Sequence, residues 1–224
     1  MGKSISIQTE NKIKTNMFRP FGPSILKTQL PNEIINDLNK DCLDILDNKK
    51  EKKDWSYQLA GKVEEEFHIT PDILIKHAKW FNTVTTEYLF SNDKNQKDDY
   101  KIGILSAWYV RQFAGDFNPY HYHTGCNISC VGYLKLPDDI NEYWKKEDKD
   151  NNPIGGYIDF RYGTVGLNCP NNFKVKPKVG DFYMFPNWLD HQVYPFKSKY
   201  AFPDKKGERR SFSLNILFDR IYEK

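Results

Sequence analysis

The spacing of apolar residues along the chain changes near residue 100. Before that point apolar residues recur every three or four positions, as they do on one face of a helix. This spacing predicts a helix that starts at Pro31 and continues through Leu46, and a second helix that runs from Pro71 to about Leu89. The lysine-rich stretch Asn48–Asp54 between them is typical of a solvated loop.

After residue 100 the pattern changes to short strands. Runs of β-branched and aromatic residues alternate with pairs of Gly, Asn, Asp and Pro that form turns. The runs that we expect to form strands are 102–112, 128–136, 156–162, 173–177, 181–186, 192–194 and 211–221. Such strands favour an antiparallel sandwich or barrel. We therefore expect one α+β, mainly β, domain over residues 1–224, with a helical lead-in (1–100) packed against a β-sandwich or jelly-roll core (101–222).

Composition and charge exclude several classes of protein. The chain has 33 Lys and Arg against 30 Asp and Glu, a net charge of +3, which is too even for the basic stripe of a nucleic-acid-binding protein. No apolar run approaches the ~18 residues that cross a bilayer, and none with a cleavage site follows Met1. We expect neither nucleic acid nor a membrane as a partner, and a cytoplasmic location.

The four cysteines are Cys42, Cys126, Cys130 and Cys169, and none forms a C-x-x-C pair. Without a secretion signal, an extracellular disulfide framework is not expected. We interpret them as reduced thiols, with Cys126 and Cys130 as packing residues. A thiolate zinc site is the alternative.

Two of the five histidines form a spaced pair. His121 and His123 flank Tyr122, and side chains two residues apart on an extended segment leave the same face. One cation could therefore bind both imidazoles. We expect the two histidines of the first hundred residues, His68 and His77, to have structural roles.

The stretch 209–216 alternates between polar and apolar positions. The alternation places four polar residues on one face: Arg209, Ser211, Ser213 and Asn215. It places Arg210 and three apolar residues on the other: Phe212, Leu214 and Ile216. An arginine and hydroxyls on an inner face are costly unless they meet an anion. We therefore predict a carboxylate site inside a barrel, with an exposed polar face as the alternative.

Three ordered segments together resemble a known family. Gly115–Leu136 contains H-x-H and then Ser-x-Val-x-Tyr-Leu, Gly180–Val193 reads G-D-x-x-x-F-P-x-W-x-x-H-x-V, and Arg209–Asn215 reads R-x-S-x-x-x-N. These motifs resemble the iron(II)- and 2-oxoglutarate-dependent oxygenases of the double-stranded β-helix fold. The most similar group is a family found in bacteria and marine phages and related to prolyl hydroxylases. Phe18–Ser91 resembles its helical lead-in more loosely.

The resemblance implies a role for each matching residue. His121 and His191 match the two iron-binding histidines of the family. Arg209 matches the arginine that pairs with the distal carboxylate of 2-oxoglutarate, Ser211 matches a hydroxyl two positions later, and Tyr133 matches a tyrosine that helps to bind that carboxylate. The resemblance thus implies Fe(II), 2-oxoglutarate and O2, with ascorbate as an optional reductant. A phage origin would place the protein in an infected bacterial host.

The chain departs from the family pattern at His123. Most members have Asp or Glu there, which completes a facial triad of two histidines and one carboxylate. Here either His123 binds the metal, or water takes its place, or a carboxylate such as Asp116 or Asp190 moves in. We favour His123, because its spacing and face are right. The catalytic metal ligands that we predict are therefore His121, His123 and His191.

The resemblance to prolyl hydroxylases favours hydroxylation of an unactivated C–H bond on a prolyl residue of a peptide or protein. The stretch Glu142–Phe173 could form a lid beside the site, or it could be a solvated insertion on the surface. We also expect an aromatic wall near the histidines, built from Trp108, Tyr109, Tyr120, Tyr122 and Trp188.

Three alternatives stay open. The first is a small-molecule substrate, namely a free amino acid that would need a second carboxylate anchor, such as Arg111 or Lys135. The second is a three-histidine dioxygenase that does not use 2-oxoglutarate, although Arg209 with Ser211 argues against it. The third is a non-catalytic β-barrel module that binds a metal for structure only.

Overall fold

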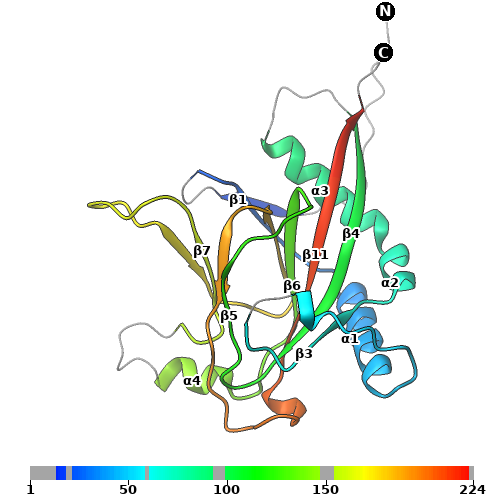
Figure 1. The fold of residues 1–224 in the computed structure, drawn as a ribbon, viewed down its shortest axis with the longest axis vertical. Coiled ribbons are helices and arrows are strands. Elements are labelled where there is room, and N and C mark those ends of the chain that lie inside the picture. Colours follow the sequence, from blue (N-terminus) through cyan, green and yellow to red (C-terminus); the bar gives the residue numbers. More distant parts are fainter. Residues whose placement is uncertain (1–13, 19–21, 59–60, 93–98, 147–153, 222–224) are drawn as a thin grey trace, which may run out of the picture.

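The computed structural model describes residues 14–18, 22–58, 61–92, 99–146 and 154–221. Within them, two antiparallel sheets face each other as a sandwich (Figure 1). The large sheet has the strand order β1-β2-β9-β6-β11-β4-β3, and the small sheet has the order β5-β10-β7-β8. This arrangement confirms the expected mainly β architecture of a double-stranded β-helix.

The strands of the large sheet are β1 (Thr15–Phe18), β2 (Ile25–Gln29), β3 (Glu65–His68), β4 (Asp99–Gln112), β6 (Ile128–Lys135), β9 (Asp181–Pro186) and β11 (Arg209–Ile221). Those of the small sheet are β5 (Asn118–His121), β7 (Ile158–Arg161), β8 (Asn172–Val175) and β10 (Asp190–Val193). The helices are α1 (Asn32–Leu46), α2 (Pro71–Lys76), α3 (Ala78–Asn92) and α4 (Ile140–Lys146), with short 3-10 turns η1 (Ser56–Gln58) and η3 (Lys205–Gly207).

The apolar face of β11 packs under the helices. Phe212, Leu214 and Ile216 are buried in one cluster with Leu38 of α1 and Phe81 of α3. Burying a side chain of this kind stabilises the fold by roughly 1.5–3 kcal/mol. The alternation predicted for this strand is therefore confirmed, and its polar face is directed between the two sheets.

The expectation of a helical lead-in over residues 1–100 is incomplete. This part of the chain also supplies β1, β2 and β3, which extend the large sheet at both edges. These strands are only four or five residues long, and their pairing is with distant segments: β2 with β9, and β3 with β4. Local periodicity does not reveal such strands, because partners far along the chain stabilise them.

The second predicted helix is divided in two. It ends at Lys76, and a new helix starts at Ala78, so that His77 lies at the break. The ring of His77 is buried, and its Nε2 lies 2.7 Å from a carboxylate oxygen of Asp37 on α1. This contact supports the structural role expected for His77. None of the helices in the described ranges is both long and apolar enough to span a membrane.

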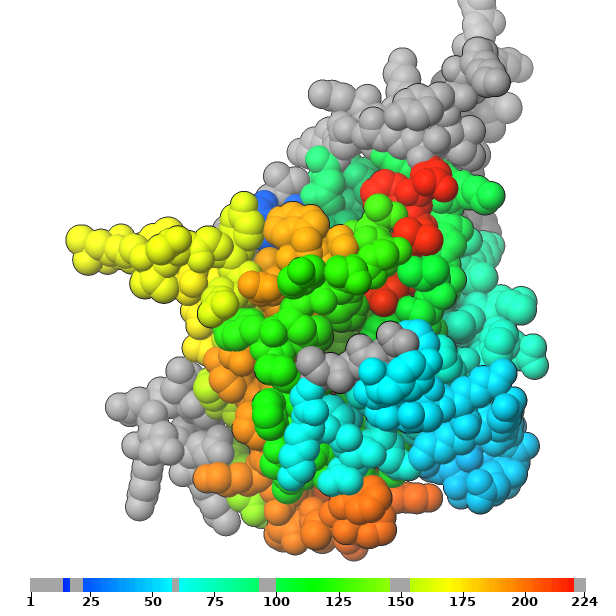
Figure 2. Space-filling view, viewed as in Figure 1, coloured from blue at the N-terminus to red at the C-terminus, as the bar shows by residue number. Residues whose placement is uncertain are grey.

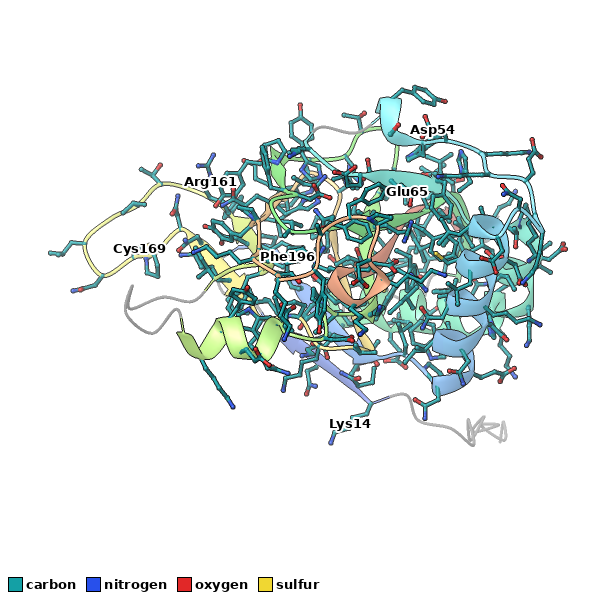
Figure 3. The ribbon with its side chains drawn as sticks, turned by 90° about the horizontal axis from the view of Figure 1, so that it is seen from below. Lys14, Asp54, Glu65, Arg161, Cys169 and Phe196 are labelled. Atoms are coloured by element: carbon teal, nitrogen blue, oxygen red, sulfur yellow. The ribbon has the colours of Figure 1, made fainter. Side chains whose placement is uncertain are left out.

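The segment Glu142–Phe173 contributes to the sandwich and also projects from it. It contains most of α4 and all of β7. The side chain of Ile158 on β7 is buried in a cluster with residues of the large sheet. The β7–β8 hairpin then extends away from the body of the molecule (Figure 2), with Leu167 96% exposed. Seen from below, Cys169 lies on this hairpin and Arg161 lies at its base (Figure 3).

Candidate active site

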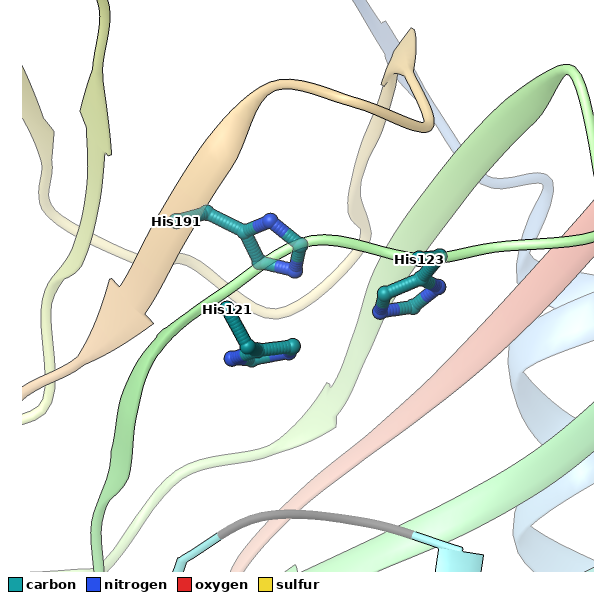
Figure 4. A group of neighbouring side chains, drawn as sticks. All are labelled: His121, His123 and His191. Atoms are coloured by element: carbon teal, nitrogen blue, oxygen red, sulfur yellow. The ribbon is translucent and has the colours of Figure 1, made fainter.

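Three histidines meet between the sheets, and we call them the histidine triad: His121, His123 and His191. His121 ends β5 and is paired in register with His191 of β10. His123 follows two residues later, where its backbone N–H donates to the carbonyl of Asn187 and its carbonyl accepts from the Asn187 amide, both over 2.9 Å. One ring nitrogen of each histidine lies within 4.8 Å of the others, and the rings surround a common centre (Figure 4).

The second ring nitrogen of each histidine is already engaged. Nδ1 of His121 and Nδ1 of His191 each donate to the carbonyl oxygen of the residue two positions earlier, over 2.7 and 2.9 Å. Nδ1 of His123 donates to Oδ1 of Asn215 over 2.6 Å. Because a carbonyl oxygen can only accept, each proton is on Nδ1, and the three Nε2 lone pairs are free. This is how proteins orient imidazoles toward a metal ion.

Asn215 is itself held in place on the polar face of β11. Its Nδ2 donates to the hydroxyl of Ser106 over 3.1 Å, and Ser129 donates to its Oδ1 over 3.3 Å. Both contacts turn the amide oxygen toward His123. The sequence pattern placed Asn215 on the inner face but did not indicate that it orients a histidine.

Burial keeps the triad neutral. It lowers the pKa of His121 and the pKa of His123 below the ordinary value of 6.5. It lowers the pKa of His191 well below that value, and the two neighbouring rings add to the effect. Neutral imidazole is the form that binds a metal, so the triad is in the ligand-competent form at neutral pH.

A second set of polar groups lies at the start of β11. Arg209 is 2% exposed, and its Nη1 donates to the side chain of Gln112, whereas Nε and Nη2 have no hydrogen-bond partner among the described residues. The hydroxyl of Tyr133 also has none, and the ring of Tyr133 lies 5.0 Å from the guanidinium carbon. A buried cation with free donors is costly unless an anion pairs with it. The unsatisfied donors of Arg209 and Tyr133 together suit both oxygen atoms of one carboxylate group.

One cavity of about 50 Å³ joins the two sets of groups. Its lining includes the histidine triad, Trp108, Arg209, Ser211, Ser213 and Glu66. The structure thus brings together the predicted metal ligands and two of the predicted carboxylate-binding residues, while Tyr133 lies against Arg209. Glu66 was not identified from the sequence.

The proposed alternative carboxylates do not join the triad. Asp116 accepts hydrogen bonds from the backbone N–H groups of Phe113 and Glu64, over 2.9 and 3.2 Å, and so stabilises a turn. Asp190 belongs neither to the group of candidate ligands nor to the cavity lining in the described residues. Within the described chain, His123 is the residue that completes the group.

The anchors considered for a free amino acid lie elsewhere. Arg111 is buried in ion pairs with Glu65 and Glu208. The ammonium group of Lys135 donates to the carbonyl of Lys205. Among the described residues that line the cavity there is neither Arg111 nor Lys135. These two side chains therefore do not provide the second carboxylate anchor that a free amino acid would need.

The aromatic wall is smaller than expected. Trp108 lines the cavity, and its ring centroid is 5.8 Å from that of His123. Tyr109 lies on the helix side of the sheet and donates to Asp41, while Tyr120 donates to Asp159, both over 2.9 Å. The remaining two expected members, Tyr122 and Trp188, are 59% and 51% exposed.

Comparisons with known proteins agree with this site. Residues 106–215, which contain the triad and Arg209, match the model of a family described as "Putative 2OG-Fe(II) oxygenase". This match, which spans just under half of the chain, indicates an enzyme of the 2OG-Fe(II) oxygenase class, for which Fe(II) and 2-oxoglutarate are the cofactor and co-substrate. Among curated proteins no sequence gives a significant match.

Solved structures show the same fold at low identity. A prolyl-4-hydroxylase from Pseudomonas putida is 15% identical, with a TM-score of 0.52 over 85% of this chain and 91% of its own. The epimerase SnoN of nogalamycin biosynthesis is 13% identical, with a TM-score of 0.52 over 85% and 77%. The carbocyclase SnoK of the same biosynthesis is 9% identical, with a TM-score of 0.51 over 85% and 79%. Three different reactions on one fold mean that the likeness identifies the architecture and not the substrate.

Proposed function

We propose that the chain is an oxygenase in which the histidine triad holds Fe(II) and in which Arg209, Tyr133 and Ser211 bind the distal carboxylate of 2-oxoglutarate. The observation that carries this proposal is that Arg209, which lines the cavity of the triad, has two nitrogens without a hydrogen-bond partner among the described residues. The Tyr133 hydroxyl, on a ring packed against Arg209, is likewise unsatisfied there. The distal carboxylate of 2-oxoglutarate, placed against Arg209 and Tyr133, would satisfy these groups. Charge-assisted hydrogen bonds of this kind are among the strongest in proteins.

The residues of the chain have distinct tasks in this reaction. Bound Fe(II) supplies the chemistry that couples decarboxylation of 2-oxoglutarate, to succinate and CO2, with transfer of one atom of O2 into a C–H bond. Asn215 and the two backbone carbonyls keep the protons of the triad on Nδ1. Arg209 orients the co-substrate, and the buried cavity excludes bulk water.

The third ligand in this proposal is neutral. A histidine in place of the usual carboxylate leaves the metal centre one unit more positive than in a site of two histidines and one carboxylate. Because Asn215 Oδ1 accepts a hydrogen bond from the Nδ1–H of His123, it strengthens the Nε2 of that imidazole as a metal ligand.

We further propose that the reaction is hydroxylation of a prolyl residue of a peptide or protein. Two observations support this substrate class: the resemblance of the three sequence motifs to those of relatives of prolyl hydroxylases, and the Trp108 ring in the cavity. Aromatic rings suit proline because they offer broad apolar contact and lose little entropy. Succinate formation that short prolyl peptides stimulate, and that matched alanyl peptides do not, would support the assignment. Equal stimulation by both sets would contradict it.

Replacement of Arg209 tests the co-substrate site. Because lysine cannot reproduce the two-pronged pair, Arg209→Lys should weaken 2-oxoglutarate binding about tenfold or more. The measurement is an anaerobic titration of 2-oxoglutarate into Mn(II)-loaded protein.

Arg210→Lys is the matched control, because Arg210 binds Glu208 and Asn39 outside the cavity. The 2-oxoglutarate affinity of this variant should stay within about twofold of wild type, which is a change of about 0.4 kcal/mol in binding free energy. An effect at Arg210 and none at Arg209 would refute the assignment.

A further inference from the structure

A buried glutamate lines the cavity of the triad, and one of its carboxylate oxygens is unsatisfied among the described residues. Glu66 lies on β3 at the edge of the large sheet and is 4% exposed. Its Oε1 has no hydrogen-bond partner in the part of the chain that the structure describes, and the residue lines the same cavity as Arg209 and the triad. Glu66 pairs in register with Val110 of β4, and Val110 pairs with Ser211 of β11 on its other side. Glu66 is therefore two strands, roughly 10 Å of backbone, from the proposed 2-oxoglutarate site.

The electrostatic surroundings of Glu66 leave its charge uncompensated. Burial, together with the nearby carboxylates of Asp54 and Asp116, raises the pKa of Glu66 from 4.5 to about 7. The arginine of β4, Arg111, is paired with Glu65 and Glu208. Buried charges in proteins are paired, so a cationic group that the described residues do not supply is expected opposite Glu66.

Neither the metal ion nor 2-oxoglutarate, the other two components of the proposed site, uses the carboxylate of Glu66. Glu66 is outside the group of residues whose ligand atoms converge on a metal position. The carboxylates of 2-oxoglutarate would be repelled by it, and the distal carboxylate has Arg209 as its proposed partner instead. The remaining component is the primary substrate.

We propose that Glu66 binds a protonated nitrogen of the primary substrate, an ammonium or guanidinium group. This proposal rests on the proposed function, because it names a chemical requirement of the substrate of the same site. In a peptide, the cation would be the secondary ammonium of an N-terminal proline or a basic side chain beside the proline. In a small molecule, it would be an amine.

The test measures binding and not turnover. Mn(II)-loaded protein with 2-oxoglutarate is kept without O2, and the paramagnetic relaxation of probe protons reports binding near the metal. The probes are two matched pairs: L-prolinamide with N-acetyl-L-prolinamide, and acetyl-Lys-Pro-Gly-amide with acetyl-Gln-Pro-Gly-amide. The cationic member of at least one pair should bind about tenfold more tightly than its neutral partner. The first pair represents a free amine and the second a basic peptide, so the pair that discriminates identifies the source.

Two variants assign that preference to Glu66. Glu66→Gln should abolish the difference between the pair members and should keep a native thermal unfolding transition. Glu64→Gln removes the same charge from an exposed glutamate outside the cavity lining and should keep the difference.

Four results would overturn the proposal. In the wild-type protein, these are equal binding of the cationic and neutral probes, or no binding of either cationic probe at millimolar concentration. In Glu66→Gln, they are a preference for the cationic probe that survives, or an equal loss of affinity for Mn(II) and for the probe. The last result would mean that Glu66 only offsets the charge of the metal. Failure of the proposed function is distinct, because it appears as absent 2-oxoglutarate binding in the Arg209 titration.

Discussion

The raised pKa of Glu66 makes the stability of the protein depend on pH in a defined direction. In the unfolded chain this carboxyl group titrates near 4.5, and in the folded protein near 7. Between these values the folded state binds more protons than the unfolded state, so the free energy of unfolding falls as pH rises. A shift of about 2.5 units corresponds to about 3 kcal/mol in total, most of which lies between pH 5 and pH 8. Glu66→Gln, which resembles the protonated form, should remove this contribution.

Urea denaturation of metal-free wild type and Glu66→Gln at pH 5, 6, 7 and 8 measures this effect. The unfolding free energy of the variant minus that of wild type should increase by about 2–3 kcal/mol from pH 5 to pH 8. Because the histidines and the other carboxylates are common to both proteins, the difference isolates Glu66. Glu64→Gln should give a nearly constant difference, since Glu64 is exposed. A constant or decreasing difference for Glu66→Gln would refute the reasoning.

Three further predictions concern the metal site and the packing of the large sheet. Asn215→Ala removes the acceptor that orients His123 and should lower Mn(II) affinity about 10–100-fold in a chelator competition, whereas unchanged affinity would contradict a ligand role for His123. His123→Ala should lower that affinity too, while His123→Asp should retain metal binding because a carboxylate is the usual ligand at this place. Gly132→Ala should lower the free energy of unfolding by ~1–3 kcal/mol in urea, because its Cβ would lie 2.2 Å from the buried Phe212 ring. Gly103→Ala, which meets nothing within 4 Å, is the control and should change it much less.

The parts of the fold that could be predicted are those with a local pattern. The polar and apolar faces of β11 follow from strict alternation over eight residues, and the structure places Arg209 and Phe212 on the faces expected. The spacing of His121 and His123 likewise anticipates that both rings reach one centre, because extended chain has a fixed period of two. The part played by His191 followed only from the resemblance of its motif to the family.

The parts that could not be predicted depend on pairing between distant segments. β3 begins within three consecutive glutamates, Glu64, Glu65 and Glu66, and nothing local distinguishes them. The register with β4 turns Glu66 toward the cavity, while Glu65 pairs with Arg111. A shift of one residue in that register would exchange the two.

The role of Asn215 also depends on tertiary structure. Its amide reaches His123 across 92 residues of sequence. The motif that contains Asn215 indicated the strand face but not this partner.

The most direct test of the central claim is the formation of succinate from 2-oxoglutarate by the purified protein in air, followed by mass spectrometry. We predict that succinate forms only when Fe(II) is present, that His191→Ala abolishes it, and that Arg209→Lys requires about tenfold more 2-oxoglutarate for the same rate. Protein that binds Fe(II) yet forms no succinate, either alone or with the prolyl and amine probes, would contradict the assignment of this cavity to Fe(II) and 2-oxoglutarate.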